Sequence, residues 1–274
     1  MAGFVFNDAM MKSLSGEVPL FQAIFVRGLF ASALIIAFAW ARGALNLRIP
    51  RPDRPRVGLR LFSEVLSTCF FLTALYNMPL ANAVAIIQAA TLSVALCAAL
   101  FLGEQVGWRR YLAISVGFVG VLLIVRPGSD GFNIYALAAL AAVCSITMRD
   151  LVTRRFSRSV PGLTVTVLTS LTITTMGGIA MLFIQTVPIT WEHLAVLGGG
   201  SVFLLVGYYA GVEAMRIGEV GAVSPFRYTN LIWALILGFA IFGEIPDGLT
   251  FAGAAIIVCS GLYTLHRERV RKET

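Results

Sequence analysis

The feature that most constrains this chain is a succession of long apolar segments separated by short polar connections. Because 58% of the residues are hydrophobic and only 13% are charged, a soluble globular fold is excluded. A helix of about 20 apolar residues crosses a bilayer, and most of these segments reach or approach that length. The segments cover residues 20–41, 59–76, 80–102, 111–126, 132–150, 162–186, 194–215, 220–242 and 249–265.

The first 14 residues form a further apolar segment that is too short to cross a bilayer unaided. They include Asn7, Asp8 and Lys12 and lack the basic start and small-residue cleavage site of a signal peptide. The chain therefore either begins inside its first helix or has an unusually short first helix. With this segment included, we predict an all-α membrane protein with ten transmembrane helices.

Basic residues in the connections alternate between two sides when ten helices are assumed. Of the 21 Lys and Arg residues, 17 fall on one side and only Lys12 and Arg126 fall on the other, while Arg27 and Arg227 lie within apolar segments. Connections rich in Lys and Arg stay in the cytoplasm. We therefore expect a multi-pass protein with both termini in the cytoplasm. The net charge of +7 then reflects membrane orientation and not binding to nucleic acid.

The two halves of the chain resemble each other. Residues 83–104 and 222–244 are apolar stretches that begin Ala-Val and end Gly-Glu. A second match, at an offset of 142 residues, pairs Asp8 with Asp150, Lys12 with Arg154 and Pro19 with Pro161. Two matches in the same order indicate a duplication. We predict two five-helix repeats, residues 1–127 and 128–274, which are inverted relative to each other because five crossings are an odd number.

The span pattern, the repeats, the Gly-Glu endings and the run Tyr-Asn-Met-Pro-Leu-Ala-Asn-Ala at residues 76–83 resemble the EamA branch of the drug/metabolite transporter superfamily. The resemblance covers nearly the whole chain, although the first helix in that family normally makes a full crossing. It implies a bacterial inner-membrane carrier of amino acids, nucleosides, vitamins, S-adenosylmethionine or drugs, in either direction. Two inverted bundles that exchange conformations open a central cavity to opposite sides in turn, which is alternating access.

Polar and aromatic residues inside the spans are the candidates for a substrate site. Arg227 has the strongest case, because a charge within a span rarely faces lipid and because Pro225 kinks the same helix. Arg27 lies about 10 Å along its helix from the membrane surface. Each arginine could instead belong to an internal ion pair. The predicted substrate-binding residues are Arg27, Gln88, Tyr208, Tyr209, Arg227, Tyr228, Asn230 and Trp233.

Four acidic residues in or near the spans are predicted to bind protons or to act as gates, namely Asp8, Glu64, Asp150 and Glu213. Their spacing also allows structural ion pairs between neighbouring positions on one helix. These pairs are Asp8 with Lys12, Glu64 with Arg60, Asp150 with Arg154, and Glu213 with Arg216.

Enzyme motifs are absent from the sequence, which has no nucleotide-binding loop, HExxH or GxSxG. Four cysteines lie in apolar segments without CxxC spacing, which favours buried thiols over metal ligands or disulfides. We expect no cofactor, and transport driven by an ion gradient, by exchange or by the substrate's own gradient. An intramembrane enzyme, a scaffold and a channel are the alternatives, and the inverted duplication disfavours the channel.

The candidate side chains favour a substrate with a conjugated ring and with carbonyls or a carboxylate, because aromatic rings stack while amides and guanidinium groups bind oxygen. Riboflavin uptake is the specific prediction, ahead of aromatic amino acids and S-adenosylmethionine. Export of amino acids or drugs and transport of nucleosides stay open. The expected partners are a small-molecule substrate and the lipid bilayer, without nucleic acid, and the sequence does not determine the oligomeric state.

Overall fold

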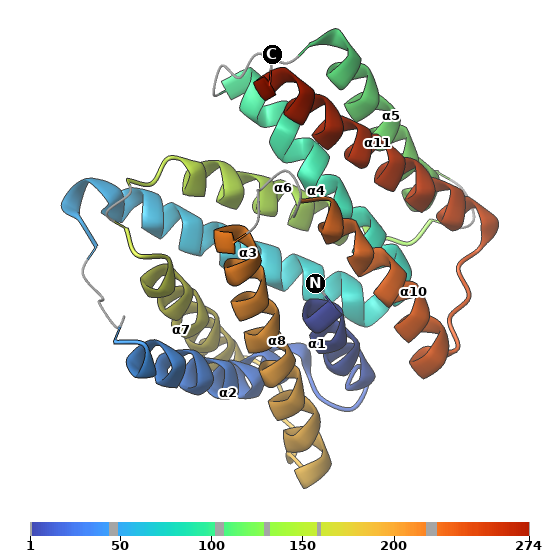
Figure 1. Cartoon of the computed structure of the whole chain (residues 1–274). Coiled ribbons are helices and arrows are strands. Elements are labelled where there is room, and N and C mark those ends of the chain that lie inside the picture. Colours follow the sequence, from blue (N-terminus) through green and yellow to red (C-terminus); the bar gives the residue numbers. More distant parts are fainter. Residues whose placement is uncertain are drawn as a thin grey trace.

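The computed structural model describes residues 2–43, 49–101, 107–128, 132–157, 160–217 and 224–273, with only the backbone at 209, 211–217, 224–225 and 267–273. These residues form helices and no strands, so the predicted all-α fold is confirmed for the described part of the chain. The helices, shown in Figure 1, are α1 (Ala2–Ser13), α2 (Leu20–Ala41), η1 (Arg51–Asp53), α3 (Arg54–Asn77), α4 (Leu80–Phe101), α5 (Trp108–Val125), α6 (Tyr135–Arg154), α7 (Gly162–Met181), α8 (Trp191–Ile217), η2 (Ser224–Tyr228), α10 (Thr229–Phe242) and α11 (Gly248–Glu273).

Local sequence explains where these helices begin and end. Pro19, Pro79 and Pro161 directly precede α2, α4 and α7, as proline suits a helix start, where the first amides have no partner within the helix. At the other end, Gly243 terminates α10 with φ 64°, a left-handed conformation that glycine adopts without steric cost. The predicted segments 20–41 and 80–102 consequently agree with α2 and α4 to within one residue.

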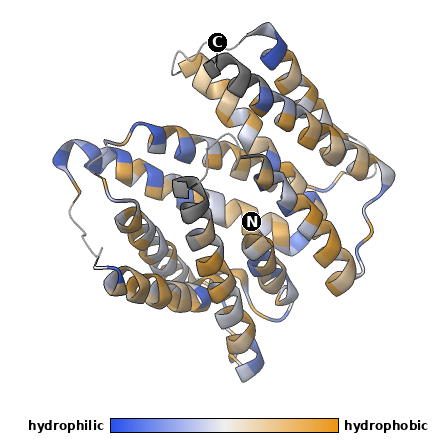
Figure 2. Cartoon of the chain, viewed as in Figure 1, coloured by the Kyte–Doolittle hydropathy of each residue, from blue (hydrophilic) through white to orange (hydrophobic). Residues whose placement is uncertain are grey.

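Seven of the described helices are long and apolar enough to cross a membrane, judged by length and composition, and α10 is apolar but shorter. Hydrophobic residues run along the helices, while hydrophilic residues gather in several of the connections (Figure 2). Trp40, Phe183 and Trp191 are exposed on the outer surface, which suits lipid contact and would be unfavourable in water. Cys144 and Cys259 are also exposed, so the prediction of buried thiols is wrong for these two.

Helices α5 and α11 approach each other backbone to backbone. A Cβ atom at Gly120 would lie 2.7 Å from the carbonyl oxygen of Gly253, and one at Gly253 would lie 2.5 Å from the carbonyl oxygen of Gly120. Helices α2 and α7 make a similar contact at Gly28 and Gly177. Small residues permit such close packing inside a membrane, where the hydrophobic effect does not drive helices together.

One end of the molecule joins the ends of α4 and α6 to the start of α3. The hydroxyl of Ser157 donates a hydrogen bond to Asp53, and Arg155 donates one to the carbonyl of Phe101 over 3.4 Å. We call this the arginine-rich end. The described helix ends and connections near it carry Arg42, Arg51, Arg54, Arg56, Arg109, Arg110, Arg154 and Arg155.

The opposite end joins the end of α1, the end of α10 and the start of α4. Lys12 forms an ion pair with Glu244 at 2.7 Å and also donates to the carbonyl of Met78. The amide of Leu80 donates to the same Glu244 carboxylate at 2.7 Å, at the positive N-terminus of α4. Glu244, the last residue of the second Gly-Glu ending, therefore ties three helix ends together.

A second ion pair at the opposite end joins the end of α5 to the start of α11. Arg126 and Thr250 donate hydrogen bonds to Asp247 and thereby lower the pKa of this carboxyl from 3.8 to about 2. About half of the Asp247 side chain is exposed to solvent. Solvent screening leaves such an exposed pair with little effect on stability.

Candidate substrate site

Arg27 on α2 is the most buried cation among the candidates, with 8% of its surface exposed. Its Nη1 donates to Oδ1 of Asn7 on α1 at 3.3 Å, and its backbone carbonyl accepts a hydrogen bond from Ser201 on α8 at 3.0 Å. Among the residues that the structure describes, no group accepts a hydrogen bond from its Nε. The guanidinium thus retains donors for another acceptor in the interior of the helix bundle.

Asp8 lies beside Arg27 and interacts with it electrostatically. Its Oδ1 accepts a hydrogen bond from Nδ2 of the neighbouring Asn7 at 3.1 Å. The predicted pair of Asp8 with Lys12 is wrong, because the long Lys12 side chain extends from the last turn of α1 to Glu244. Asp8 is therefore associated with the buried arginine and not with the opposite end.

Glu64 on α3 has two arginine partners. Its pair with Arg60, one helical turn away, is confirmed at 3.5 Å, and Arg149 on α6 adds a second contact at 3.3 Å. Arg149 also donates through Nε to Asp150 at 2.8 Å, so Asp150 pairs with its sequence neighbour, while its pair with Arg154 stays a prediction. The sequence analysis missed Arg149 as a partner of Glu64. The adjacent opposite charges of Arg149 and Asp150 at the end of an apolar segment were a signal that both take part in ion pairs. Buried charges are retained in proteins when they are paired in this way.

Tyr208 on α8 connects these groups. It interacts electrostatically with Glu64, Arg149 and Arg27, and Arg27 interacts in turn with Tyr76 on α3. The buried hydroxyl of Tyr76 has no hydrogen-bond partner among the described residues. We call the whole group the central polar site, formed by Asn7, Asp8, Arg27, Glu64, Tyr76, Arg149 and Tyr208.

Aromatic rings from α1, α8 and α10 adjoin the central polar site. Phe6 stacks on Phe203 with ring centroids 5.0 Å apart and lies 5.9 Å from Trp233, while Phe4 packs edge-on against Tyr208 at 5.3 Å. We call these five residues the aromatic wall. The sequence predicted Trp233 and Tyr208 here, but it did not reveal that α1 packs between α8 and α10 and brings Phe4 and Phe6 to them.

Gln88 and Arg227 form a separate group. Gln88 on α4 is buried, and its Nε2 donates to the backbone carbonyl of Arg227 at 2.9 Å. The irregular backbone predicted at Pro225 is present as the 3-10 segment η2. Of the described side chains of this segment, Phe226 and Arg227 are exposed and Tyr228 is buried, so Arg227 does not lie in the interior as its position within a span predicted.

Three predicted site residues remain, of which one has a described side chain. Asn230 lies one residue into α10, and its buried Oδ1 has no hydrogen-bond partner among the described groups. Tyr209 and Glu213, together with the predicted partner Arg216, have side chains outside the described set. Arg27 and Arg227 therefore belong to different groups, and the first of them has the surroundings of a ligand-binding residue.

Comparison with known proteins identifies the family. The model of the EamA-like transporter family matches residues 1–126 and 133–265. The chain belongs to this family. The predicted resemblance is confirmed, and the EamA-like proteins are transporters and not enzymes.

Individual EamA-like relatives carry different substrates in their names. The S-adenosylmethionine uptake transporter of Rickettsia prowazekii (strain Madrid E) is 29% identical over 96% of this chain and 88% of the relative. The riboflavin transporter of Vibrio cholerae is 29% identical over 74% of this chain and 68% of the relative. The pseudopaline exporter CntI of Pseudomonas aeruginosa is 27% identical over 94% and 91%.

The fold is shared with a protein of known crystal structure. The two chains are 22% identical, align over 96% of this chain and 94% of the other, and superpose with a TM-score of 0.62.

Proposed function

We propose that this chain is a secondary carrier of a small organic metabolite in a bacterial inner membrane. It crosses the membrane ten times as two inverted five-helix repeats, residues 1–127 and 128–274, and works by alternating access. The family model supports this division, because its two matched segments separate close to residue 127. The arginine-rich end faces the cytoplasm, as expected for connections rich in basic residues.

The observation that carries the proposal is the environment of Arg27. Among the described residues the buried guanidinium has one hydrogen-bond partner, the neutral Asn7, and no acceptor for Nε, which is costly in a membrane bundle unless a ligand completes its hydrogen bonds. Guanidinium groups bind carboxylates through two parallel hydrogen bonds. Arg27 consequently binds a carboxylate of the substrate.

The substrate class follows from the mixture of charges and rings. Arg27 suits a carboxylate, while Asp8 suits an ammonium or sulfonium group, because its own hydrogen bond comes from the neutral Asn7. The aromatic wall suits a planar heterocycle. S-Adenosylmethionine has a carboxylate, an ammonium, a sulfonium and an adenine ring, and it is our preferred substrate. The names of the Rickettsia relatives support this choice.

Riboflavin is the second candidate. Its flat ring system fits the aromatic wall, and relatives in Vibrio and Rhizobium are named riboflavin transporters. Riboflavin carries no carboxylate or ammonium, however, and it offers no charged group to Arg27 or Asp8. The buried charges therefore reverse the preference that the aromatic residues alone suggested.

Asp8 is also the best candidate for a coupling proton. Glu64 pairs with two arginines and Asp150 with Arg149, so the charges of these carboxylates are already balanced inside the site. Asp8 has Arg27 nearby and, from the described residues, accepts one hydrogen bond, that of the Asn7 amide. Substrate binding that engages Arg27 changes the electrostatic surroundings of Asp8, which links the two events.

Counterflow in proteoliposomes tests the function. Vesicles loaded with unlabelled S-adenosylmethionine should accumulate the labelled compound, because only a carrier exchanges one for the other. Empty liposomes and vesicles with Arg27→Ala protein are the controls. Exchange of riboflavin without exchange of S-adenosylmethionine would establish the second candidate, and the absence of exchange for both compounds would refute both substrate proposals.

A further inference from the structure

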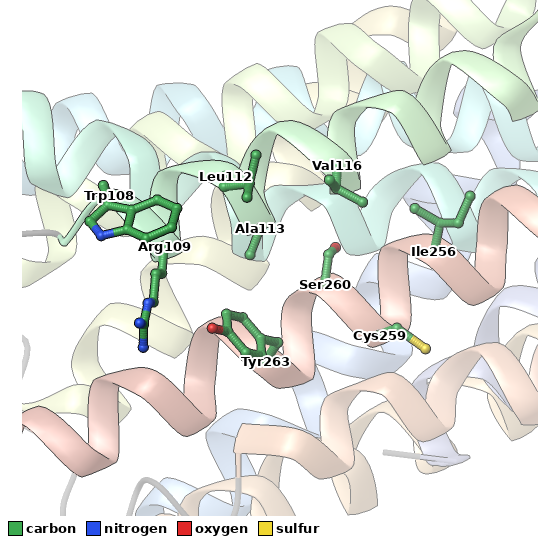
Figure 3. Close-up of a pocket in the computed structure, with 9 residues that line it drawn as sticks. All are labelled: Trp108, Arg109, Leu112, Ala113, Val116, Ile256, Cys259, Ser260 and Tyr263. Carbon is green, nitrogen blue, oxygen red and sulfur yellow. The ribbon is translucent and has the colours of Figure 1, made fainter.

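A groove of about 440 Å³ runs along the contact between α5 and α11, away from the central polar site. Figure 3 shows Trp108 and Arg109 at one end of this groove and Ile256 toward the other. Val116 and Cys259 line the part of the groove that lies farther from Arg109 (Figure 3). The family assignment and the proposed transport site do not use these residues. We call this the α5–α11 groove.

The polarity of the groove changes along its length. Its polar end carries the guanidinium of Arg109, the indole of Trp108 and the phenol of Tyr263, whose hydroxyl is turned toward the Arg109 end (Figure 3). Among the described lining residues the other hydroxyl is that of Ser260, which donates to the carbonyl of Ile257 at 3.0 Å and is therefore satisfied. The remainder of the groove presents apolar surface and thiol.

Arg109 lies at the polar end of the groove, next to Trp108. Its guanidinium lies 5.5 Å from the centre of the Trp108 ring, and no carboxylate pairs with it among the described residues. Trp108 is 70% exposed at the first position of α5, where tryptophan suits the boundary between headgroups and acyl chains. The N-terminal amides of α5 add positive potential at the same place.

We propose that the α5–α11 groove binds an anionic phospholipid of the surrounding bilayer. Arg109 holds the headgroup phosphate, and one acyl chain lies along Leu112, Val116 and Ile256. A headgroup that carries net negative charge is favoured, because basic residues near the membrane surface attract anionic lipids. None of the described side chains that line the groove is acidic, so they offer no partner to the ammonium of a zwitterionic metabolite.

The proposed lipid covers the outer surface of α5 and α11, two helices whose backbones are in contact at glycine residues. Gly120 and Gly253 bring the backbones of α5 and α11 together, and residues of both helices line the groove. An acyl chain in the groove contacts both helices at once. Bound lipid should therefore stabilise the pair as well as occupy the site.

Native mass spectrometry of the purified full chain tests this site, with phosphatidylglycerol and phosphatidylcholine added separately to delipidated protein. We expect Arg109→Ala to reduce retained phosphatidylglycerol about fivefold, because this is the affinity for anionic lipid that one basic residue near a membrane surface contributes. Val116→Trp fills the apolar part and should reduce retention while the charge remains. Arg42→Ala is the matched control, because Arg42 also stacks on an aromatic ring, Phe38, at 5.1 Å but lies at the end of α2.

Four results would overturn the proposal. They are equal retention of phosphatidylglycerol by Arg109→Ala and wild-type protein, equal retention of phosphatidylcholine and phosphatidylglycerol by wild-type protein, displacement of the bound lipid by soluble glycerol 3-phosphate, and a dimer that excludes lipid from the groove. The first removes Arg109 from the site, the second removes the preference for charge, the third indicates a free phosphate site, and the fourth makes the groove an interface between two copies.

Discussion

Two arginines within the apolar segments show how far a residue's surroundings can depart from its sequence context. Arg27 on α2 lies against α1 and α8, and among the described residues its guanidinium has one hydrogen-bond partner, the neutral Asn7. Arg227 lies in a 3-10 segment, has an exposed side chain and contributes its carbonyl to Gln88. The structure therefore favours Arg27 for the substrate site, although the nearby proline and aromatic residues had favoured Arg227.

Replacing Arg27 should impair transport more than replacing Arg227. We expect Arg27→Ala to lower kcat/KM about 100-fold or more, since a buried, charged hydrogen-bond partner contributes several kcal/mol. Arg27→Lys should also be impaired, because lysine does not bind a carboxylate through two parallel hydrogen bonds. Arg227→Ala should cost less than about tenfold, as expected for an exposed charge.

Initial rates of labelled S-adenosylmethionine counterflow in proteoliposomes measure these effects, with the amount of reconstituted protein determined for each variant. Size-exclusion chromatography shows whether each variant is folded. An Arg27→Ala protein that elutes as a monodisperse species but does not transport has lost substrate binding and not its fold. Wild-type kinetics for Arg27→Ala would exclude Arg27 from the site.

At the scale of the elements, helices pack in pairs through backbone contacts at glycine residues. Gly120 and Gly253 allow α5 and α11 to lie close together. A Cβ atom on either glycine would lie less than 3 Å from the carbonyl oxygen of the other. A connection also contributes, because the side chain of Gln22 makes two hydrogen bonds with the backbone of Val187, at 2.6 and 3.0 Å. This pairing attaches the connection between α7 and α8 to the first turn of α2.

Gly253→Leu should destabilise the protein, because the added side chain forces α5 and α11 apart. Overpacking of this kind costs about 1–3 kcal/mol, and thermal unfolding in detergent followed by tryptophan fluorescence should show a lower Tm. Gly58→Ala is the matched control, since nothing lies within 4 Å of a Cβ at this exposed position. Equal melting temperatures for the two variants would contradict backbone contact between α5 and α11.

At the scale of the whole molecule, the contacts of Glu244 close the opposite end. Lys12, Glu244 and the amide of Leu80 connect three helix ends, of which two belong to the first proposed repeat and one to the second. Alternating access requires such contacts to break when this end opens. The exposed pair of Arg126 with Asp247 at the same end connects α5 to α11 and contributes little by comparison.

Glu244→Gln should shift the protein toward a state open at the opposite end. The amide cannot pair with Lys12, so the closed state loses an ion pair that is largely buried. In an otherwise cysteine-free protein, Met78→Cys reports the change, because Met78 is buried beside Lys12 in the closed end. Maleimide labelling of this cysteine should become several times faster with Glu244→Gln and should change little with Asp247→Asn. Unchanged labelling with Glu244→Gln would show that Glu244 is not part of the closure.

The proposed orientation also belongs to this scale. In a cysteine-free protein, Glu192→Cys at the start of α8 should react in intact cells with an impermeant maleimide, and Arg51→Cys at the arginine-rich end should react only after the membrane is disrupted. Both positions are exposed, so access to the reagent and not burial determines the result. The reverse pattern would overturn the orientation, and labelling of both from outside would overturn the ten-span model.

The sequence by itself determined the helices, the membrane environment and the family. In lipid a backbone must satisfy its own hydrogen bonds, so apolar segments of sufficient length form helices, and prolines and glycines mark their ends. Spacing along one helix also predicted the pair of Glu64 with Arg60. All these properties depend on residues close together in the chain.

Only the tertiary structure decided which polar groups meet. The contacts of Arg149 with Glu64, Lys12 with Glu244 and Arg27 with Asn7 join residues 85, 232 and 20 positions apart. Whether such residues face each other depends on how each helix is rotated and on which helices pack side by side, and the hydrophobic pattern of a membrane helix leaves both undetermined, because lipid and protein interior are similarly apolar. The sequence therefore supplied candidate charges, and packing decided which of them lie together, as Asp8 does with Arg27.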